Sequence, residues 1–257
     1  MSFLFRDVIF GPVRSRRFGV SLGINVLPEN SKICTFNCIY CECGWTQGAV
    51  SSQESFHSRT DIREALEERL KEMVSNKRLP DALTFAGNGE PTLHPDFSGV
   101  IEDVKMLRDR YAPDADVVVL SNSTTLHIPA VFEALKGVRN IMKLDAGSEE
   151  TYRAINGPLM NLKLTEIVDH LCRFNGRLSI QTLFLRAEHQ GKMVDNTTTE
   201  EIDLWLGHLK RVQPEMVMIY PIDRPAPDGQ ISKIEKSVLE GIAARVRALG
   251  LKTEVYE

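Results

Sequence analysis

Hydrophobic positions along this chain follow two periods in turn, and the alternation predicts the order of its strands and helices. Short apolar runs bounded by Gly, Pro or polar residues predict strands at 20–27, 82–86, 117–120, 140–144, 178–185 and 216–220. Apolar residues spaced three or four apart predict amphipathic helices at 60–76, 96–111, 129–135, 162–174, 200–212 and 232–249, with an edge strand possible at 251–256. Such alternation favours a parallel sheet with right-handed crossovers.

Length and composition fit this α/β interpretation. The chain has 257 residues, 42% of them hydrophobic and 26% charged, so it can bury a full core. It is close to the ~250 residues typical of a parallel α/β barrel. We expect a single domain over 1–257, with its core at about 18–225 and the C-terminal helix and possible edge strand at 230–257.

Charge and hydropathy bear on two classes of partner, polyanions and membranes, although a local basic patch remains possible. The formal net charge of -4 and the pI near 5.9 do not indicate a surface built to grip polyanions. No apolar run approaches the ~18 residues of a membrane span, and Arg6 and Asp7 interrupt the N-terminal run too early for a signal peptide. We therefore expect a cytoplasmic protein with no membrane partner.

Four of the five cysteines are crowded into the stretch ICTFNCIYCECG after the first predicted strand. Pairing such close cysteines in a disulfide would strain the loop, so metal binding is the better hypothesis. Structural zinc normally takes two separated ligand pairs, and no second CxxC or HxxxH lies further along the chain. Cys34, Cys38 and Cys41 could instead hold three irons of a four-iron cube and leave the fourth open, as a catalytic site requires.

These motifs resemble those of the radical S-adenosylmethionine (SAM) superfamily. The CxxxCxxC loop carries an aromatic residue, Tyr40, before its last cysteine, as in the superfamily's cluster loop. The segments FGPVRSRRFG, GNGEPTLHP and YPIDRP extend the likeness to the branch of wyosine-type tRNA-base synthases and their uncharacterised relatives. The resemblance spans most of the chain and implies a partial (β/α)6 TIM-like barrel of parallel strands.

The resemblance implies two cofactors and several residues that hold them. Cys34, Cys38 and Cys41 would hold a [4Fe-4S] cluster whose open iron is chelated by SAM. In the family, the motif matched by Gly87, Asn88, Gly89 and Glu90 binds the SAM amino group. A carboxylate beside exposed backbone suits an ammonium, and glycines at a strand end permit close approach of a ligand.

Polar residues near other strand ends are further candidates. Ser121 and Asn122 follow the third predicted strand, where a helix cap or turn and a ligand contact are equally good interpretations; the resemblance favours cofactor contacts. Lys143 and Asp145 share one strand face and could line the reaction chamber, although a plain ion pair is the alternative. The resemblance implies that Asp145 lies near the cofactor or the substrate. Gln181 is a polar residue in a buried strand, so it could line the cavity.

Three further features remain open from the sequence. Arg14, Arg16 and Arg17 form either a solvated basic turn or an oxyanion clamp at the mouth of the site. Segment 186–199 has no period and predicts a loop that covers the substrate, and 221–229, with Asp223 and Arg224, predicts a second loop. Cys43 could be an alternative ligand, a thiol on the substrate side or a small buried residue, and Cys172 predicts helix packing.

Three functions are consistent with these observations. The favoured one is a radical SAM enzyme that takes hydrogen from a small molecule or RNA base and receives electrons from a donor such as flavodoxin or ferredoxin. The second is an activase that places a glycyl radical on a partner protein. The third is a non-enzymatic zinc or Fe–S module. The catalytic candidates are Asp145, Lys143 and Gln181.

Overall fold

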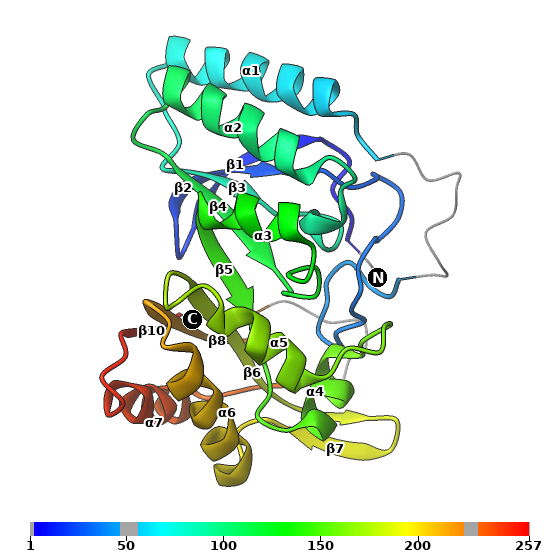
Figure 1. Cartoon of the computed structure of the whole chain (residues 1–257), viewed down its shortest axis with the longest axis vertical. Helices are drawn as coiled ribbons and strands as arrows, with labels where there is room; N and C mark the ends of the chain where they lie inside the picture. Colours follow the sequence, from blue (N-terminus) through cyan, green and yellow to red (C-terminus); the bar gives the residue numbers. More distant parts are fainter. Residues whose placement is uncertain (1–2, 47–55, 224–230, 257) are drawn as a thin grey trace.

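The computed structural model describes residues 3–46, 56–223 and 231–256 (Figure 1). Arg224 and the rest of the predicted loop up to residue 229 lie outside the described residues. None of the helices in these ranges is long and apolar enough to cross a membrane.

Six parallel strands form the centre of the sheet, and they confirm the six strands that the sequence predicts. They are paired in chain order: β2 (Gly19–Ile24), β3 (Ala82–Phe85), β4 (Asp116–Ser121), β5 (Arg139–Lys143), β6 (Ser179–His189) and β8 (Met216–Pro221). The edge strand is also confirmed, because β10 (Thr253–Val255) pairs parallel to β8. Among the described strands, no pairing joins this edge to the β1–β2 edge. The sheet is therefore an open, partial barrel, as expected.

Helices follow most of the parallel strands and cover the outer face of the sheet (Figure 1). The helices are α1 (Arg59–Ser75), α2 (Phe97–Tyr111), α3 (Pro129–Lys136), α4 (Glu149–Asn156), α5 (Leu164–Cys172), α6 (Thr199–Val212) and α7 (Lys236–Arg247), with a 3-10 turn η1 (Pro91–Leu93). Helix α1 buries the predicted stripe of Ile62, Leu66, Leu70 and Met73. It begins at a capping box in which the Ser58 side chain accepts from the Asp61 amide, two residues before the predicted start.

The two faces of each strand have different surroundings, because side chains alternate across a sheet. Outward residues such as Leu22, Leu83 and Val217 join the large core under the helices. Inward residues form a small apolar cluster of Phe18, Ala82, Val118, Ile141 and Met218. We call the space in front of these inward side chains the lumen. Lys143 and Gln181 are in register on β5 and β6 and have this inward phase.

The prediction of a loop over 186–199 is wrong. Strand β6 continues to His189, and β7 (Lys192–Asp195) returns antiparallel to it through a turn at Gln190 and Gly191, both with positive φ. The alternation is present in the sequence, since Ala187 and Val194 are buried while their neighbours are more exposed. The polar neighbours and short strand conceal this pattern. A third strand, β9 (Ile231–Lys233), pairs with β6 where the sequence predicts the start of the last helix.

Two more elements were not expected. Strand β1 (Ile9–Ser15) pairs antiparallel with β2, so Arg14 lies on a strand of this hairpin, and Arg16 and Arg17 lie in the turn that joins its two strands. The predicted helix at 162–174 is α5 alone, and α4 precedes it with Ser148 as its N-cap. The Ser-Glu-Glu start of α4 is a recognisable N-terminal signal, but the helix has only eight residues.

Candidate active site

The clustered cysteines lie in the irregular segment that follows β2, at the C-terminal end of the parallel strands. Cys34, Cys38, Cys41 and Cys43 all line one pocket of about 160 Å³. None of them forms a disulfide. In barrels of parallel strands this end carries the chemistry, so the loop has the position that catalysis requires.

Backbone hydrogen bonds hold this loop between two other segments. The Ile33 amide donates to the Asn88 carbonyl at 2.9 Å, and the Glu90 amide donates to the Ile33 carbonyl at 2.9 Å. On the other side, the Ile39 amide donates to the carbonyl of Ile155, near the end of α4. The sulfurs are therefore fixed by main-chain contacts on both sides of the loop.

Gly89 permits the closest of these contacts. Its φ is +138°, and an added Cβ would lie 1.9 Å from the Ile33 carbonyl oxygen. Gly87 likewise makes room, for the Asn25 side chain. Gly89 thus admits the protein's own cysteine loop and Gly87 admits a side chain of the segment after β2, whereas the sequence predicts close approach of a ligand.

Replacing Gly89 by alanine is expected to lower the free energy of unfolding by about 2 kcal/mol or more, because the strained φ and the backbone clash add. Urea denaturation measures this change. Gly207→Ala is the matched control, since its Cβ meets nothing within 4 Å and α6 favours alanine over glycine. Equal stability of the Gly89 variant and wild type would contradict the tight packing of the loop.

Glu90 is a buried carboxylate held only by neutral donors. One oxygen accepts from the Thr92 hydroxyl at 2.5 Å and the Ser121 hydroxyl at 2.9 Å, and the other accepts from the Asn122 amide at 2.6 Å. Burial raises the pKa of this carboxyl, although the hydrogen bonds act in the opposite direction. It lines the same pocket as the cysteines, and no cationic side chain of the described residues pairs with it.

Two asparagine side chains approach the cysteine sulfurs. Asn122 Nδ2 lies 3.5 Å from Cys34 Sγ, and Asn156 Nδ2 lies 3.5 Å from Cys38 Sγ. Burial raises the pKa of Cys34 to about 12 and also raises that of Cys38. Both side chains therefore stay protonated thiols unless a cationic centre stabilises the thiolate charge. The two amide groups would then donate hydrogen bonds to the ligand sulfurs.

Lys32 adds a buried positive charge beside the cysteines. Its side chain lines the pocket and is only 6% exposed, and its Nζ donates to the Gly44 carbonyl at 2.8 Å. No carboxylate of the described residues pairs with it. Lys32 and Asn156 were both missed from the sequence, because neither stands in a recognisable motif. Lys32 directly precedes the loop in the chain, whereas the fold brings Asn156 to it.

Tyr40, Lys143 and Asp145 form one buried network. The Tyr40 hydroxyl donates to Asp145 Oδ2, and Lys143 Nζ donates to the tyrosine oxygen and lies 3.3 Å from the same carboxylate. Asn156 Nδ2 donates to this carboxylate at 2.9 Å, and the Leu183 amide donates to its other oxygen at 3.0 Å. Burial acts to lower the pKa of Lys143, but Asp145, Tyr220 and Cys38 together raise it above its usual value.

The structure brings most of the predicted site residues to one pocket. Its lining includes Cys34, Cys38, Tyr40, Cys41, Gly87, Gly89, Glu90, Ser121, Asn122, Lys143 and Gln181. Two predicted residues lie behind the wall. Asp145 is fully enclosed by its donors, and the Asn88 side chain bonds Phe5 and the Pro28 carbonyl instead. We therefore expect Asp145 and Asn88 to act through their neighbours.

The donor set suits an iron–sulfur cube better than a single ion. No group of three or more His, Cys, Asp or Glu side chains in the described part of the chain is arranged to hold one metal ion. A cube takes each thiolate on a different iron, so its ligands stand farther apart. Several thiols in a buried pocket with amide donors and a lysine nearby fit that group.

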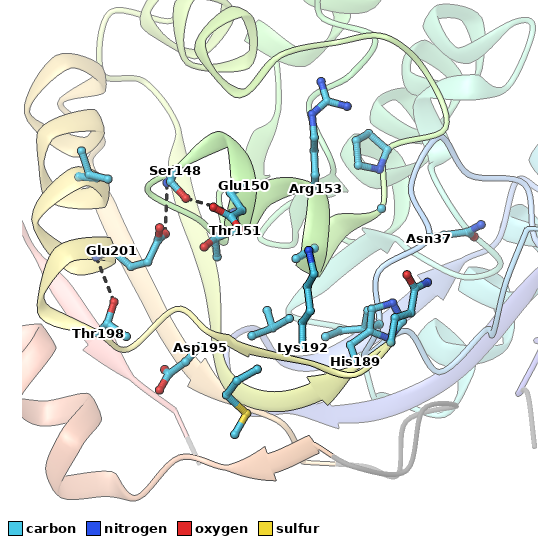
Figure 2. A pocket seen from close by; sticks show the side chains of 18 of the residues that line it. Asn37, Ser148, Glu150, Thr151, Arg153, His189, Lys192, Asp195, Thr198 and Glu201 are labelled. Atoms are coloured by element: carbon cyan, nitrogen blue, oxygen red, sulfur yellow. Dashed lines mark hydrogen bonds between the residues drawn. The ribbon is translucent and has the colours of Figure 1, made fainter.

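A larger groove lies on the other side of the same loop (Figure 2). It has a volume of about 1210 Å³ and is bounded by α4, the β6–β7 hairpin and the start of α6. Asn37 and Ile39 line this groove, whereas Phe36, Cys38 and Tyr40 line the inner pocket. Alternate residues of the loop therefore line two different spaces. Trp45, Leu159, Met193 and Leu204 are exposed apolar side chains along the groove.

A partial barrel of parallel strands with a cysteine loop after its first parallel strand defines a class of Fe–S enzyme folds. Residues 31–195 match the Radical SAM superfamily, and the chain belongs to it. Members of this superfamily are enzymes that use a [4Fe-4S] cluster and SAM and need a reductant and a substrate. The assignment made from the motifs is thereby confirmed.

Curated relatives and solved structures allow a comparison of sequence and of fold. The UPF0026 protein of Methanocaldococcus jannaschii is 31% identical over 242 residues, covering 92% of this chain and 70% of that protein. Among the curated relatives, the chain spans as little as 32% of their length. A radical SAM methyltransferase from Sphaerobacter thermophilus has a TM-score of 0.68 at 12% identity, covering 92% of this chain and 65% of its own. Archaeal TYW1 has a TM-score of 0.55 at 12% identity, covering 89% and 71%. These two structures share the fold.

Proposed function

We propose that Cys34, Cys38 and Cys41 hold a [4Fe-4S] cluster at which this chain cleaves SAM reductively. When bound, the reduced cluster supplies the electron that breaks the sulfonium bond of SAM, and the resulting 5'-deoxyadenosyl radical takes a hydrogen atom from the substrate. The observation that carries the proposal is the uncompensated Glu90 carboxylate in the same pocket as these cysteines.

Glu90 would receive the amino group of SAM. A buried carboxylate with raised pKa and only neutral donors gains most from an ammonium partner, because the cation removes the cost of burying an unpaired charge. Ser121 and Asn122 hold the carboxylate in place, since both donate to it. Gly87 and Gly89 line the wall beside it.

Tyr40, Lys143 and Gln181 would line the side of the pocket that faces the substrate. Asp145 fixes Tyr40 and Lys143 by accepting from both. A rigid wall of this kind orients a substrate and keeps water from a reactive intermediate. We propose a small molecule or a nucleotide base as the substrate, and a flavodoxin or ferredoxin as the electron donor.

Anaerobic reconstitution with iron and sulfide tests this function. We expect a brown protein that forms 5'-deoxyadenosine from SAM when dithionite is added. A colourless protein that binds zinc and forms no 5'-deoxyadenosine would instead support a metal-binding module. Tight binding of a large partner protein, with loss of one glycine hydrogen from its backbone, would redirect the proposal to a glycyl-radical activase.

A further inference from the structure

One arginine of the basic segment turns into the lumen. Arg17 Nη1 donates to Gln181 Oε1 at 2.8 Å, and its guanidinium carbon lies 5.1 Å from the Phe18 ring centroid and 5.5 Å from that of Tyr220. It precedes β2, so it stands at the end of the strand opposite to the cysteine loop. One interpretation of the sequence is an oxyanion clamp at the mouth of the site. Arg17 instead lies at the far end of the barrel from the cysteine loop.

The other two arginines are accounted for at the surface. Arg16 pairs with Asp223 at 3.3 Å, and both side chains are about half exposed. Arg14 is exposed on β1. Arg17 differs from Arg16, because no carboxylate of the described residues pairs with it. Its planar fork has five donors, of which one is used by Gln181.

Charge around this part of the lumen is positive. Burial raises the pKa of the Tyr220 hydroxyl, while the positive charges of Lys143 and Arg17 each act to lower it. Asp145 is the carboxylate that acts on the same tyrosine, and four described groups, including Lys143, already donate to it. Arg17 thus has no counter-charge of its own among the described residues, at a partly buried position where a charged partner is worth more than at the open surface.

Gln181 has a donor group that the described residues leave unused. Its Oε1 accepts from Arg17 and, at 3.5 Å, from the Tyr220 hydroxyl. The opposite end of the amide is the NH₂ group, for which the described residues supply no hydrogen-bond acceptor. Gln181 also lines the pocket with the cysteines. Arg17 and Gln181 together therefore offer an array of unused N–H donors.

We propose that Arg17, with Gln181 and Tyr220, binds an oxyanion of the substrate, a carboxylate or a phosphate. Arginine suits either group because its planar fork can donate two parallel hydrogen bonds to two oxygens. The inference rests on the proposed function and gives it a substrate class. It also gives the substrate an orientation, with the oxyanion remote from the cysteine loop and the reacting carbon between them.

The test is calorimetric titration of the reconstituted protein with inorganic phosphate and, separately, with acetate at constant ionic strength. We expect one of the two anions to bind, and to bind wild type and Arg14→Met with the same affinity. Arg17→Met is expected to weaken that binding roughly tenfold or more, the effect of losing charge-assisted hydrogen bonds. Arg17→Lys should not restore it, since an ammonium lacks the planar fork. The anion that binds identifies a carboxylate or a phosphate substrate.

Two results would overturn the inference: no binding of either anion by wild type, or equal binding by Arg14→Met and Arg17→Met. If Arg17→Met does not fold, Arg17→Lys is compared with Arg14→Met instead. Wild-type affinity for the anion in Arg17→Lys would then contradict a two-bond contact from the guanidinium group. Formation of 5'-deoxyadenosine by Arg14→Met separates the two proposals. With 5'-deoxyadenosine formed but no anion bound, only the oxyanion site fails; with none formed, the proposed function fails.

Discussion

Replacing Cys38 by alanine is expected to abolish both cluster assembly and SAM cleavage. Cys38 is only 7% exposed, and the Asn156 amide lies against its sulfur, so no other thiol can take its position without moving the loop. Loss of one of three ligands should lower the iron content after reconstitution roughly tenfold or more. Iron analysis, the visible absorption of the cluster and the yield of 5'-deoxyadenosine measure the effect.

Two other cysteines supply matched controls for this substitution. Cys172 ends α5 and packs against the outer core, so Cys172→Ala should retain iron and activity. Cys43 lines the pocket, and its sulfur donates to the Gly87 carbonyl at 3.4 Å. We expect Cys43→Ala to retain both properties as well. Unchanged iron content in Cys38→Ala, or loss of the cluster in Cys43→Ala, would contradict the assignment of ligands.

The parallel strands could be predicted because their burial is simple. Strands covered on both faces read as continuous apolar runs, and β3 and β4 are almost wholly buried. Each of these runs is separated from the next by a helix with an apolar stripe. Period and length therefore determine the order of elements without any knowledge of tertiary contacts.

The added elements could not be predicted because they are short or partly exposed. Strands β7 and β9 have four and three residues, and their pattern is set by pairing with the extension of β6. Most residues of β1 are exposed, so it has no apolar run to mark it. In each case a tertiary partner, rather than local propensity, decides the conformation.

The residues of the candidate site also fall into those that the sequence could predict and those that it could not. Cys34, Cys38, Cys41 and Glu90 stand in motifs with a chemical reason for their spacing, and the structure brings them to one pocket. Lys32 and Asn156 carry no such signal, since a single lysine or asparagine is common on any surface. Asn156 reaches the Cys38 sulfur because the loop packs against α4, and the buried Lys32 donates across the loop to the Gly44 carbonyl. The sequence specifies neither contact locally.

Glu90→Gln is expected to weaken SAM binding roughly ten- to a hundredfold while the cluster is retained. Glutamine keeps nearly the same shape but removes the charge that would attract the ammonium, and hydrogen bonds to charged groups are worth about 1.5–3 kcal/mol. Equilibrium dialysis of the reconstituted variant measures the affinity, and iron analysis checks the cluster.

Asp103→Asn is the matched control for Glu90→Gln. It removes another poorly exposed carboxylate, one that pairs with Arg59 at 2.8 Å on the helical side of the sheet. This variant should lose stability without losing affinity for SAM, because its charge is remote from the pocket. If both variants bound SAM as wild type does, the ammonium of SAM would have another partner, and the uncompensated charge of Glu90 would need a different ligand.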